Sequence, residues 1–103
     1  MKIEEIRRRI NQGNYLIKRH AILHALKEGF ERRNMLEAIA KGKVIEDYPM
    51  ESRLLICGLT NLTKKTLIYL HIVCEYSDEY VEFVTAYLPD EYIWENPPFR
   101  RRK

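Results

Sequence analysis

Apolar residues recur at helical spacing through the first part of the chain. Ile3, Ile6 and Ile10 share one side of a helical wheel, opposite three arginines, and this pattern stops near residue 13. The same spacing returns twice, each time followed by a glycine, at Ala21, Ile22, Ala25 and Leu26 before Gly29, and at Met35, Leu36, Ile39 and Ala40 before Gly42. We predict a helix in residues 1–13 and a pair of helices within the helical region 14–42.

After Gly42 the apolar period changes to two, which indicates strands. Four stretches fit, at residues 43–48, 53–59, 67–76 and 80–88. The connections between them are short, and short connections require antiparallel neighbours. We therefore expect a single α+β domain over residues 1–103, with the N-terminal helices on one face of a four-stranded antiparallel sheet at 43–88 and a basic tail at 89–103.

The apolar positions also fix an expected strand register. A turn at residues 77–79 pairs Tyr76 with Tyr80, and a tight turn pairs Tyr48 with Arg53. The core face then holds Ile45, Leu54, Ile56, Ile68, Leu70, Ile72, Cys74, Val84, Ala86 and Leu88. The other face collects Glu46, Tyr48, Arg53, Tyr69, His71, Val73, Phe83, Thr85 and Tyr87, with His71 across from Thr85 and Tyr69 across from Tyr87.

Composition places the chain among folded proteins, with 46% hydrophobic and 32% charged residues. No apolar run approaches the roughly 18 residues that span a bilayer, and the N-terminus lacks the order of a signal peptide, so we expect a cytosolic protein. Cys57 and Cys74 lie in separate apolar runs and are expected to be reduced core thiols.

The net charge of +3 is unevenly distributed. Lys and Arg are frequent up to Lys43 and at the last four residues, whereas acidic residues outnumber basic ones in between. Such segregation favours a polyanionic partner such as RNA, or an acidic protein. A solvated basic helix and a frayed tail would produce the same pattern, so charge alone leaves both interpretations open.

The polar face of the expected sheet combines an acid, a base, a cation and hydroxyl groups. Ribose-directed cleavage of RNA needs such a set, because one group takes the proton of the 2′-hydroxyl, another protonates the leaving oxygen and a cation stabilises the phosphorane. His71 suits either proton-transfer role near neutral pH. An ordinary solvated sheet face would also carry tyrosines and threonines, so this pattern has two interpretations.

Other candidate chemistry is weaker. His20 and His24, four residues apart on a helix, would suit two zinc ligands, but the chain offers few further ligands, and we expect no metal and no cofactor. None of the four glycines has the spacing of a phosphate-binding loop, and no serine or cysteine nucleophile motif is present. Trp94 and Phe99 either pack along the sheet edge or stack on a nucleobase.

Several segments together resemble one family. They are "RHAILHALKEG", "MLEAIAKGKVIEDYP", "RLLICG", "LHIVCEY" and "VTAYLPD", the last with a Trp five residues beyond its Pro. In this order they are similar to family 4258 of the domains of unknown function, over about residues 18–101. That resemblance implies the sheet architecture of small toxin ribonucleases of the RelE and BrnT type. It further implies an endoribonuclease that a cognate antitoxin, of the zinc-finger or helix-turn-helix type, inhibits.

The resemblance also implies the site. His71 would be the general base or acid, Glu46 its complement or orienting group, and Arg53 the phosphate clamp. The expected catalytic set is His71, His20, Glu46, Arg53, Thr85 and Tyr87, and the expected RNA-binding set is Tyr48, Arg100, Arg101 and Arg102. The alternative function is a non-enzymatic interaction module or an inactive toxin homologue. The oligomeric state and the RNA target stay open.

Overall fold

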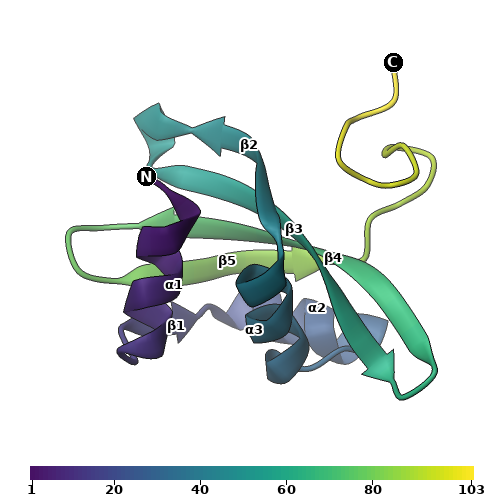
Figure 1. Cartoon of the computed structure of the whole chain (residues 1–103), viewed down its shortest axis with the longest axis horizontal. Coiled ribbons are helices and arrows are strands. Elements are labelled where there is room, and N and C mark those ends of the chain that lie inside the picture. The colour runs from purple at the N-terminus through teal and green to yellow at the C-terminus, as the bar shows by residue number, and fades with distance from the viewer.

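A computed structural model describes all 103 residues, as three helices and one five-stranded sheet (Figure 1). The helices are α1 (Ile3–Asn11), α2 (Arg19–Glu28) and α3 (Arg32–Lys41). The strands are β1 (Tyr15–Ile17), β2 (Lys43–Tyr48), β3 (Arg53–Thr63), β4 (Thr66–Tyr76) and β5 (Val81–Tyr87), with a single 3₁₀ turn, η1 (Pro49–Glu51), between β2 and β3. The fold is therefore α+β, as the sequence predicts.

The sheet is mixed, which corrects the expectation of four antiparallel strands. Its order is β1-β5-β4-β3-β2, and β1 pairs with β5 in parallel, Tyr15 opposite Val81 and Ile17 opposite Phe83. Strand β1 has three residues, too few for a period-two pattern to be visible in the sequence. It exists because the β5 edge offers unpaired main-chain groups, a contact between positions far apart in the chain.

All three helices pack on one face of the sheet, as expected, and bury the main core there. The core joins Ile6 of α1, Ala21 and Ala25 of α2 and Ala38 of α3 to the sheet. Its sheet residues are Leu54, Ile56, Leu70, Ile72, Cys74, Val81, Phe83 and Ala86. In Figure 1 the last part of the chain, shown in yellow, forms a loop on the side away from the helices. We call the helix-free face the outer face and residues 89–103 the C-terminal segment.

Helix ends follow local rules. Gly29 closes α2 in the left-handed conformation with φ at 84°, where a side chain would be strained. At the start of α3, the amide side chain of Asn34 accepts a hydrogen bond from the Glu31 N–H at 2.8 Å, in a capping box. Asn34 is fully buried and also donates to the Thr60 hydroxyl at 2.9 Å, which ties α3 to β3.

The β2–β3 hairpin has the expected pairing of Tyr48 with Arg53, with a bulge between Val44 and Glu46. Glu46 lies opposite Leu55, which in turn lies opposite Val73. Glu46, Tyr48 and Arg53 therefore lie on the outer face, as predicted. The bulge is the reason that Val44, and not Ile45, lies opposite core residue Ile56 and packs against the core.

The β4–β5 pairing differs from the prediction by a register shift. Tyr76 pairs with Val81 instead of Tyr80, and a bulge lies between Val73 and Cys74. His71 is consequently opposite Tyr87, not Thr85, and Tyr69 has no partner on β5. Beyond the bulge the faces exchange, so Phe83 is fully buried in the core, and Val84 is only half-buried.

Two arginines of α1 that the pattern assigns to the solvated side have structural contacts. Arg9 is 7% exposed, and its guanidinium donates to the carbonyls of Ser77, Asp78 and Tyr80 in the β4–β5 loop at 2.6, 2.9 and 3.1 Å. This anchor fixes a loop longer than the predicted turn, which explains the register shift. Arg7 donates to the carbonyls of Ile39 and Gly42 at the end of α3.

Candidate active site on the outer face

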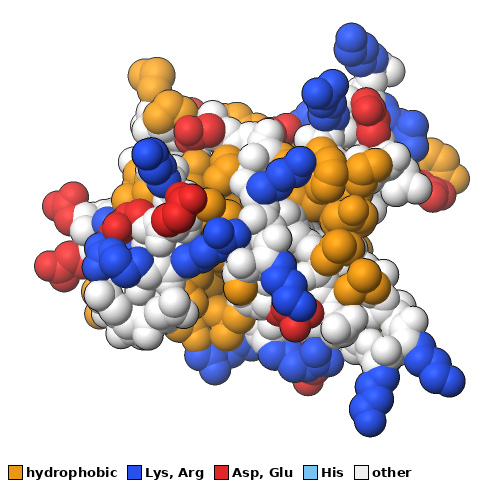
Figure 2. All heavy atoms as spheres, in the orientation of Figure 1, with side chains coloured by type: hydrophobic (Ala, Val, Ile, Leu, Met, Phe, Trp, Pro, Cys, Tyr) orange, Lys and Arg blue, Asp and Glu red, His pale blue; other side chains and the backbone are white.

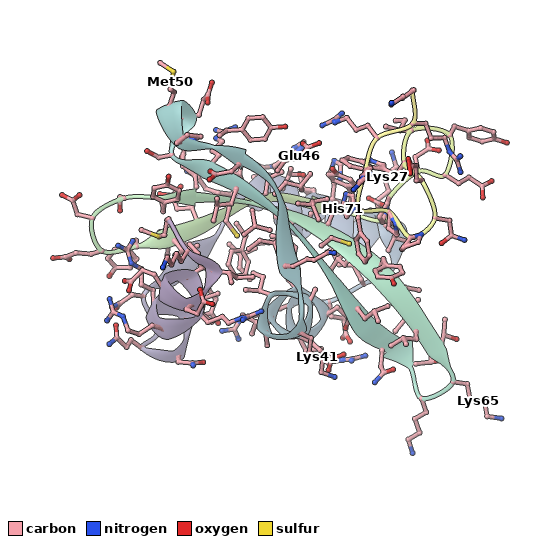
Figure 3. The ribbon with its side chains drawn as sticks, turned by 45° about the horizontal axis from the view of Figure 1, so that its top comes forward. Lys27, Lys41, Glu46, Met50, Lys65 and His71 are labelled. Atoms are coloured by element: carbon pink, nitrogen blue, oxygen red, sulfur yellow. The ribbon has the colours of Figure 1, made fainter.

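The outer face carries its polar side chains in rows across the strands. The pairings place Lys43, Cys57, His71 and Tyr87 in one row, Glu46, Leu55, Val73 and Thr85 in the next, and Tyr48, Arg53 and Glu75 in a third. Residues in one row are neighbours on adjacent strands, which lie about 4.8 Å apart. In Figure 3 Glu46 and His71 lie beside the C-terminal segment, far from the hairpin ends marked by Met50 and Lys65.

His71 is the centre of this face and is completely buried. Its Nε2 lies 2.8 Å from the carbonyl oxygen of Pro98, and its Nδ1 lies 3.3 Å from the hydroxyl of Tyr87. Because a carbonyl only accepts, Nε2 carries the proton and donates it; neutral Nδ1 then accepts from the Tyr87 O–H. Burial lowers the pKa of His71, which keeps the ring neutral, although the Pro98 carbonyl opposes this shift.

Aromatic rings of the C-terminal segment cover the row. The indole of Trp94, 3% exposed, meets the His71 ring edge-on with centroids 4.4 Å apart. Phe99 meets Tyr69 edge-on at 5.5 Å, and the ammonium of Lys43 lies 3.8 Å from the centre of the Phe99 ring. From the sequence, Trp94 and Phe99 are expected either to pack along the sheet edge or to stack on a nucleobase. In the structure, both lie on the outer face itself.

Glu46 and Arg101 form the polar margin of the cluster. The Arg101 guanidinium donates to both carboxylate oxygens of Glu46, at 2.9 and 3.1 Å, and the Tyr48 hydroxyl donates to the same carboxylate. These donors, Arg101 first, lower the pKa of Glu46 and keep it ionised. Both charges also act on the pKa of His71, in opposite directions. Burial raises the pKa of Tyr87 to about 12, so its phenol stays protonated.

The structure brings together only part of the predicted catalytic set. His71 and Tyr87 are in contact, and Glu46 lies in the adjacent row, where its charge acts on His71. Arg101 of the predicted RNA-binding set and Tyr48 both bind Glu46. Thr85 lies on the outer face in the next row, opposite Val73, and its buried hydroxyl has no hydrogen-bond partner.

Three predicted residues lie away from His71. Arg53 pairs with Glu75 at 3.1 Å, and Glu75 is four residues along β4 from His71, a span of about 13 Å. Arg100 is exposed, and Arg102 donates to the Glu91 carbonyl at 2.6 Å within the C-terminal segment.

His20 is also separate from the cluster. It is exposed on α2, and its ring contacts that of His24 with centroids 4.5 Å apart. Helix α2 packs through Ala21 and Ala25 into the core on the helical face. No three His, Cys, Asp or Glu side chains are grouped as a metal site would require.

Sequence reasoning did not identify Lys43 or Pro98 as members of the cluster. Lys43 is at the start of β2, in the His71 row, and its only sequence signal is its place on the polar side of the strand. Pro98 acts through its carbonyl, which no side-chain pattern reveals. Cys57 lies opposite His71, but burial raises the pKa of its thiol to about 11, so it is a neutral, free thiol.

The comparisons with known proteins place the chain in a family. Residues 17–88, more than two thirds of the chain, match the model of a family described as Domain of unknown function (DUF4258). The chain belongs to the DUF4258 family. No curated protein and no solved structure matches it.

The DUF4258 match begins at the last residue of β1 and ends at Leu88, just after β5. It therefore contains α2, α3 and the four following strands, and it is shorter than the expected extent of about 18–101. Helix α1 and the C-terminal segment lie outside it. None of the three helices has the length and apolar character that crossing a membrane requires.

Proposed function

We propose that the protein is a metal-independent, toxin-like endoribonuclease whose active site is the His71 cluster of the outer face. One observation supports this function best: a neutral imidazole, a phenol that donates to it and an ionised carboxylate occupy one cluster on the face that the helices leave open. The resemblance of the DUF4258 motifs to RelE- and BrnT-type toxin ribonucleases supports the same function. On that ground we also propose a RelE-like architecture.

In the proposed reaction, the unprotonated Nδ1 of His71 takes the proton of a ribose 2′-hydroxyl, whose oxygen attacks the adjacent phosphorus. The bond from phosphorus to the 5′-oxygen breaks, and that oxygen takes a proton from the Tyr87 phenol. The products are a 2′,3′-cyclic phosphate and a 5′-hydroxyl, and the proton returns from His71 to Tyr87 along their 3.3 Å contact. Glu46, ionised beside the cluster, stabilises the protonated His71.

The cation of this reaction is Lys43 in our proposal, and not Arg53. Lys43 is in the His71 row, whereas Arg53 is about 13 Å along the sheet and is paired with Glu75. A positive charge in the same row stabilises the extra negative charge of the phosphorane. The exposed terminal arginines, Arg100 and Arg102, would hold the RNA backbone beyond the cluster.

The test uses purified full-length protein and a single-stranded RNA in the presence of a chelator. We expect a product that ends in a 2′,3′-cyclic phosphate, and a loss of at least 100-fold in rate in His71→Gln, because removal of the base removes proton transfer. His24→Gln, on the helical side, is the matched control and keeps the wild-type rate. In cells, expression arrests growth and His71→Ala relieves the arrest. Correctly folded protein that neither cuts RNA nor arrests growth would refute the function.

The complete burial of His71 favours one alternative, a non-enzymatic interaction module or inactive toxin homologue. In that case every outer-face contact is structural, and the protein binds one protein partner independently of salt. An enzyme that holds RNA through phosphates instead loses RNA affinity steeply as salt rises. The two functions are therefore separated by the salt dependence of binding and by the effect of His71→Gln.

The partner in the proposed function is a cognate antitoxin, and we assign it to the exposed apolar side of α2. Ile22, Leu23 and Leu26 are 46, 50 and 76% exposed there, beside a groove of about 320 Å³ between α2 and α3. Arg32 and Glu31 line the groove, Glu31 is paired with Arg33, and Lys27 follows Leu26 on α2, so an amphipathic segment with acidic flanks is the complement we propose. Two copies of this chain would bring like charges together.

Leu26→Asp tests that assignment by co-expression with the protein encoded by the neighbouring gene. We expect the partner to co-purify with the wild type and with the control Leu67→Asp, whose apolar side chain is 58% exposed on the distant β3–β4 hairpin, but not with Leu26→Asp. Retention of the partner by Leu26→Asp would refute the assignment. A dimer of the isolated protein that Leu26→Asp dissociates would show that a second copy occupies this surface.

A further inference from the structure

The C-terminal segment closes the site that the proposed function requires to be open. Trp94 and the Pro98 carbonyl leave no exposed surface on His71. An imidazole with no access to solvent cannot reach a ribose hydroxyl, because proton transfer needs contact at about 3 Å or a single bridging water. Figure 1 shows the segment as a separate loop beside the sheet, and Figure 2 shows its tip as a projection rich in Lys and Arg, with hydrophobic side chains at its base.

The segment is held on the sheet by side chains and not by main-chain pairing. Its main-chain hydrogen bonds stay within it, as in Trp94 N–H to Asp90 O, Glu95 N–H to Arg100 O and Arg102 N–H to Ile93 O. The contacts with the sheet are the His71–Pro98 bond, the Glu46–Arg101 pair and the aromatic contacts. The segment can therefore move off as a unit without breaking a strand ladder.

These contacts are of the kinds that single-stranded RNA makes. Trp94 meets His71 and Phe99 meets Tyr69 edge-on, so the outer face presents two aromatic rings, His71 and Tyr69, on which nucleobases could pack once the segment leaves. The Pro98 carbonyl oxygen accepts from the Nε2–H of His71 at 2.8 Å, and a phosphate oxygen of bound RNA would accept from the same N–H. The ammonium of Lys43 lies over the Phe99 ring, and Lys43 is in the same row as His71.

The family match provides an independent observation. It ends at Leu88 and so contains every sheet residue of the cluster but none of the C-terminal segment. The sheet residues of the polar outer face thus lie within the family match, and the segment that covers them lies outside it.

We propose that the C-terminal segment is an internal occupant of the RNA-binding site, with Trp94 and Phe99 in the places of two nucleobases and the Pro98 carbonyl in the place of an RNA phosphate oxygen. Single-stranded RNA takes the site by displacing the segment. This inference rests on the proposed ribonuclease function and adds its regulation: the free protein is closed, and RNA must compete with the segment. If the site is open only a fraction of the time, the apparent RNA affinity is the intrinsic affinity multiplied by that fraction.

The experiment compares full-length wild type, Trp94→Ala, and the control Tyr92→Ala, whose side chain is 85% exposed on the same segment. Two quantities are measured: the cleavage rate at limiting single-stranded RNA, and the exchange of the His71 Nε2 proton with water by NMR. We expect Trp94→Ala to exchange this proton rapidly and to cleave at least tenfold faster than wild type, with Tyr92→Ala unchanged. Phe99→Ala, at a half-buried position, repeats the comparison if Trp94→Ala does not fold.

The outcomes separate the two proposals. A variant that exposes His71 but cleaves RNA at the wild-type rate overturns the occupancy of the site, and the ribonuclease function stands. If His71 becomes exposed and no protein cleaves RNA, the ribonuclease function fails, and the assignment of RNA as the competitor fails with it.

A second measurement tests displacement directly in the wild type. A 2′-O-methyl RNA of the same sequence binds without being cleaved, because it has no free 2′-hydroxyl. We expect its saturation to release the single tryptophan, Trp94, from its contact with His71, which shifts the tryptophan emission to that of an exposed indole. Binding that leaves the Trp94 emission unchanged shows that RNA and the segment occupy different places, and it overturns the proposal.

Discussion

His71 is buried and neutral because Trp94 covers it, and not because of its place on β4. Its neutral ring is fixed by a donor, Tyr87, on one nitrogen and an acceptor, Pro98, on the other. A buried neutral histidine with satisfied nitrogens stabilises the closed arrangement, because protonation would place a charge among aromatic rings. The residue that the proposed chemistry needs is therefore also the residue that holds the C-terminal segment in place.

The lowered pKa of His71 makes stability depend on pH. An unfolded histidine has a pKa of about 6.5, so below that pH the unfolded chain binds a proton that the folded protein excludes. The free energy of unfolding then falls as the pH drops from about 6.5 toward the folded-state pKa, by at most about 1.4 kcal/mol per pH unit. In His71→Gln, which keeps a donor toward Pro98, the fall is smaller. Urea titrations between pH 5 and 7 measure both slopes, and equal slopes would contradict this assignment.

Arg9 differs from Arg8 although both lie in one basic run. Both pair with Glu5, but the buried Arg9 also donates to three carbonyls of the β4–β5 loop, whereas Arg8 is exposed and makes no such contact. We expect Arg9→Ala to cost about 2–4 kcal/mol of unfolding free energy, because three carbonyls lose a charged donor. Arg8→Ala, the matched control, costs less than about 1 kcal/mol. Denaturant titrations compare the two, and similar losses would show that the loop does not depend on Arg9.

At the scale of elements, helix α3 approaches β3 so closely that only glycine fits between them. A Cβ on Gly58 would lie 1.9 Å from the carbonyl oxygen of Ala38, and one on Gly42 would lie 2.4 Å from the same atom. Main-chain atoms cannot move aside as a flexible side chain can. This contact sets how deeply α3 sits on the sheet, and with it the start of β2, where Lys43 is located.

Gly58→Ala separates crowding from backbone strain when it is compared with Gly13→Ala. Gly13 has φ at 79° and open space around it, so alanine there costs only the left-handed conformation, about 1–2 kcal/mol. Gly58→Ala has to displace α3 and is expected to cost more than about 3 kcal/mol. Thermal and denaturant unfolding provide both values. A loss at Gly58 no larger than that at Gly13 would mean that α3 moves without penalty.

At the scale of the whole molecule, the two faces of the sheet have different roles. The helical face holds the main core, and the outer face holds the polar cluster under the C-terminal segment. Part of the N-terminal basic charge is committed to structure, since Arg7 and Arg9 bind main-chain carbonyls. The exposed terminal residues Arg100 and Lys103 are therefore better placed to meet a polyanion.

If RNA binds at this end of the molecule, its affinity depends on salt through these terminal charges. We expect Arg100→Gln with Lys103→Gln to reduce the slope of log affinity against log salt by roughly 1.4, because each phosphate contact on a single strand contributes about 0.7. The control pair is Lys64→Gln with Lys65→Gln, on the distant β3–β4 hairpin in Figure 3, and it leaves the slope unchanged. Fluorescence anisotropy with single-stranded RNA measures both slopes. A larger effect of the hairpin pair would move the RNA site away from the C-terminal segment.

Local patterns in the sequence were sufficient for much of the fold. Helical spacing followed by glycine located α1, α2 and α3, and period-two runs located β2 to β5, because these patterns depend on residues only a few positions apart. The same alternation of side chains along the strands placed Glu46, His71 and Tyr87 on one face. The DUF4258 motifs, read in order, were sufficient for the family.

What only the tertiary structure decided depends on contacts between distant positions. Strand β1 exists through its pairing with β5, and the Arg9 anchor and a bulge set the β4–β5 register. The cluster around His71 depends on Pro98 and Arg101, 27 and 30 positions further along the chain, where no periodic pattern records which face the segment covers. Sequence order fixes which residues can share a strand face, but only packing decides which of them meet and which are closed to solvent.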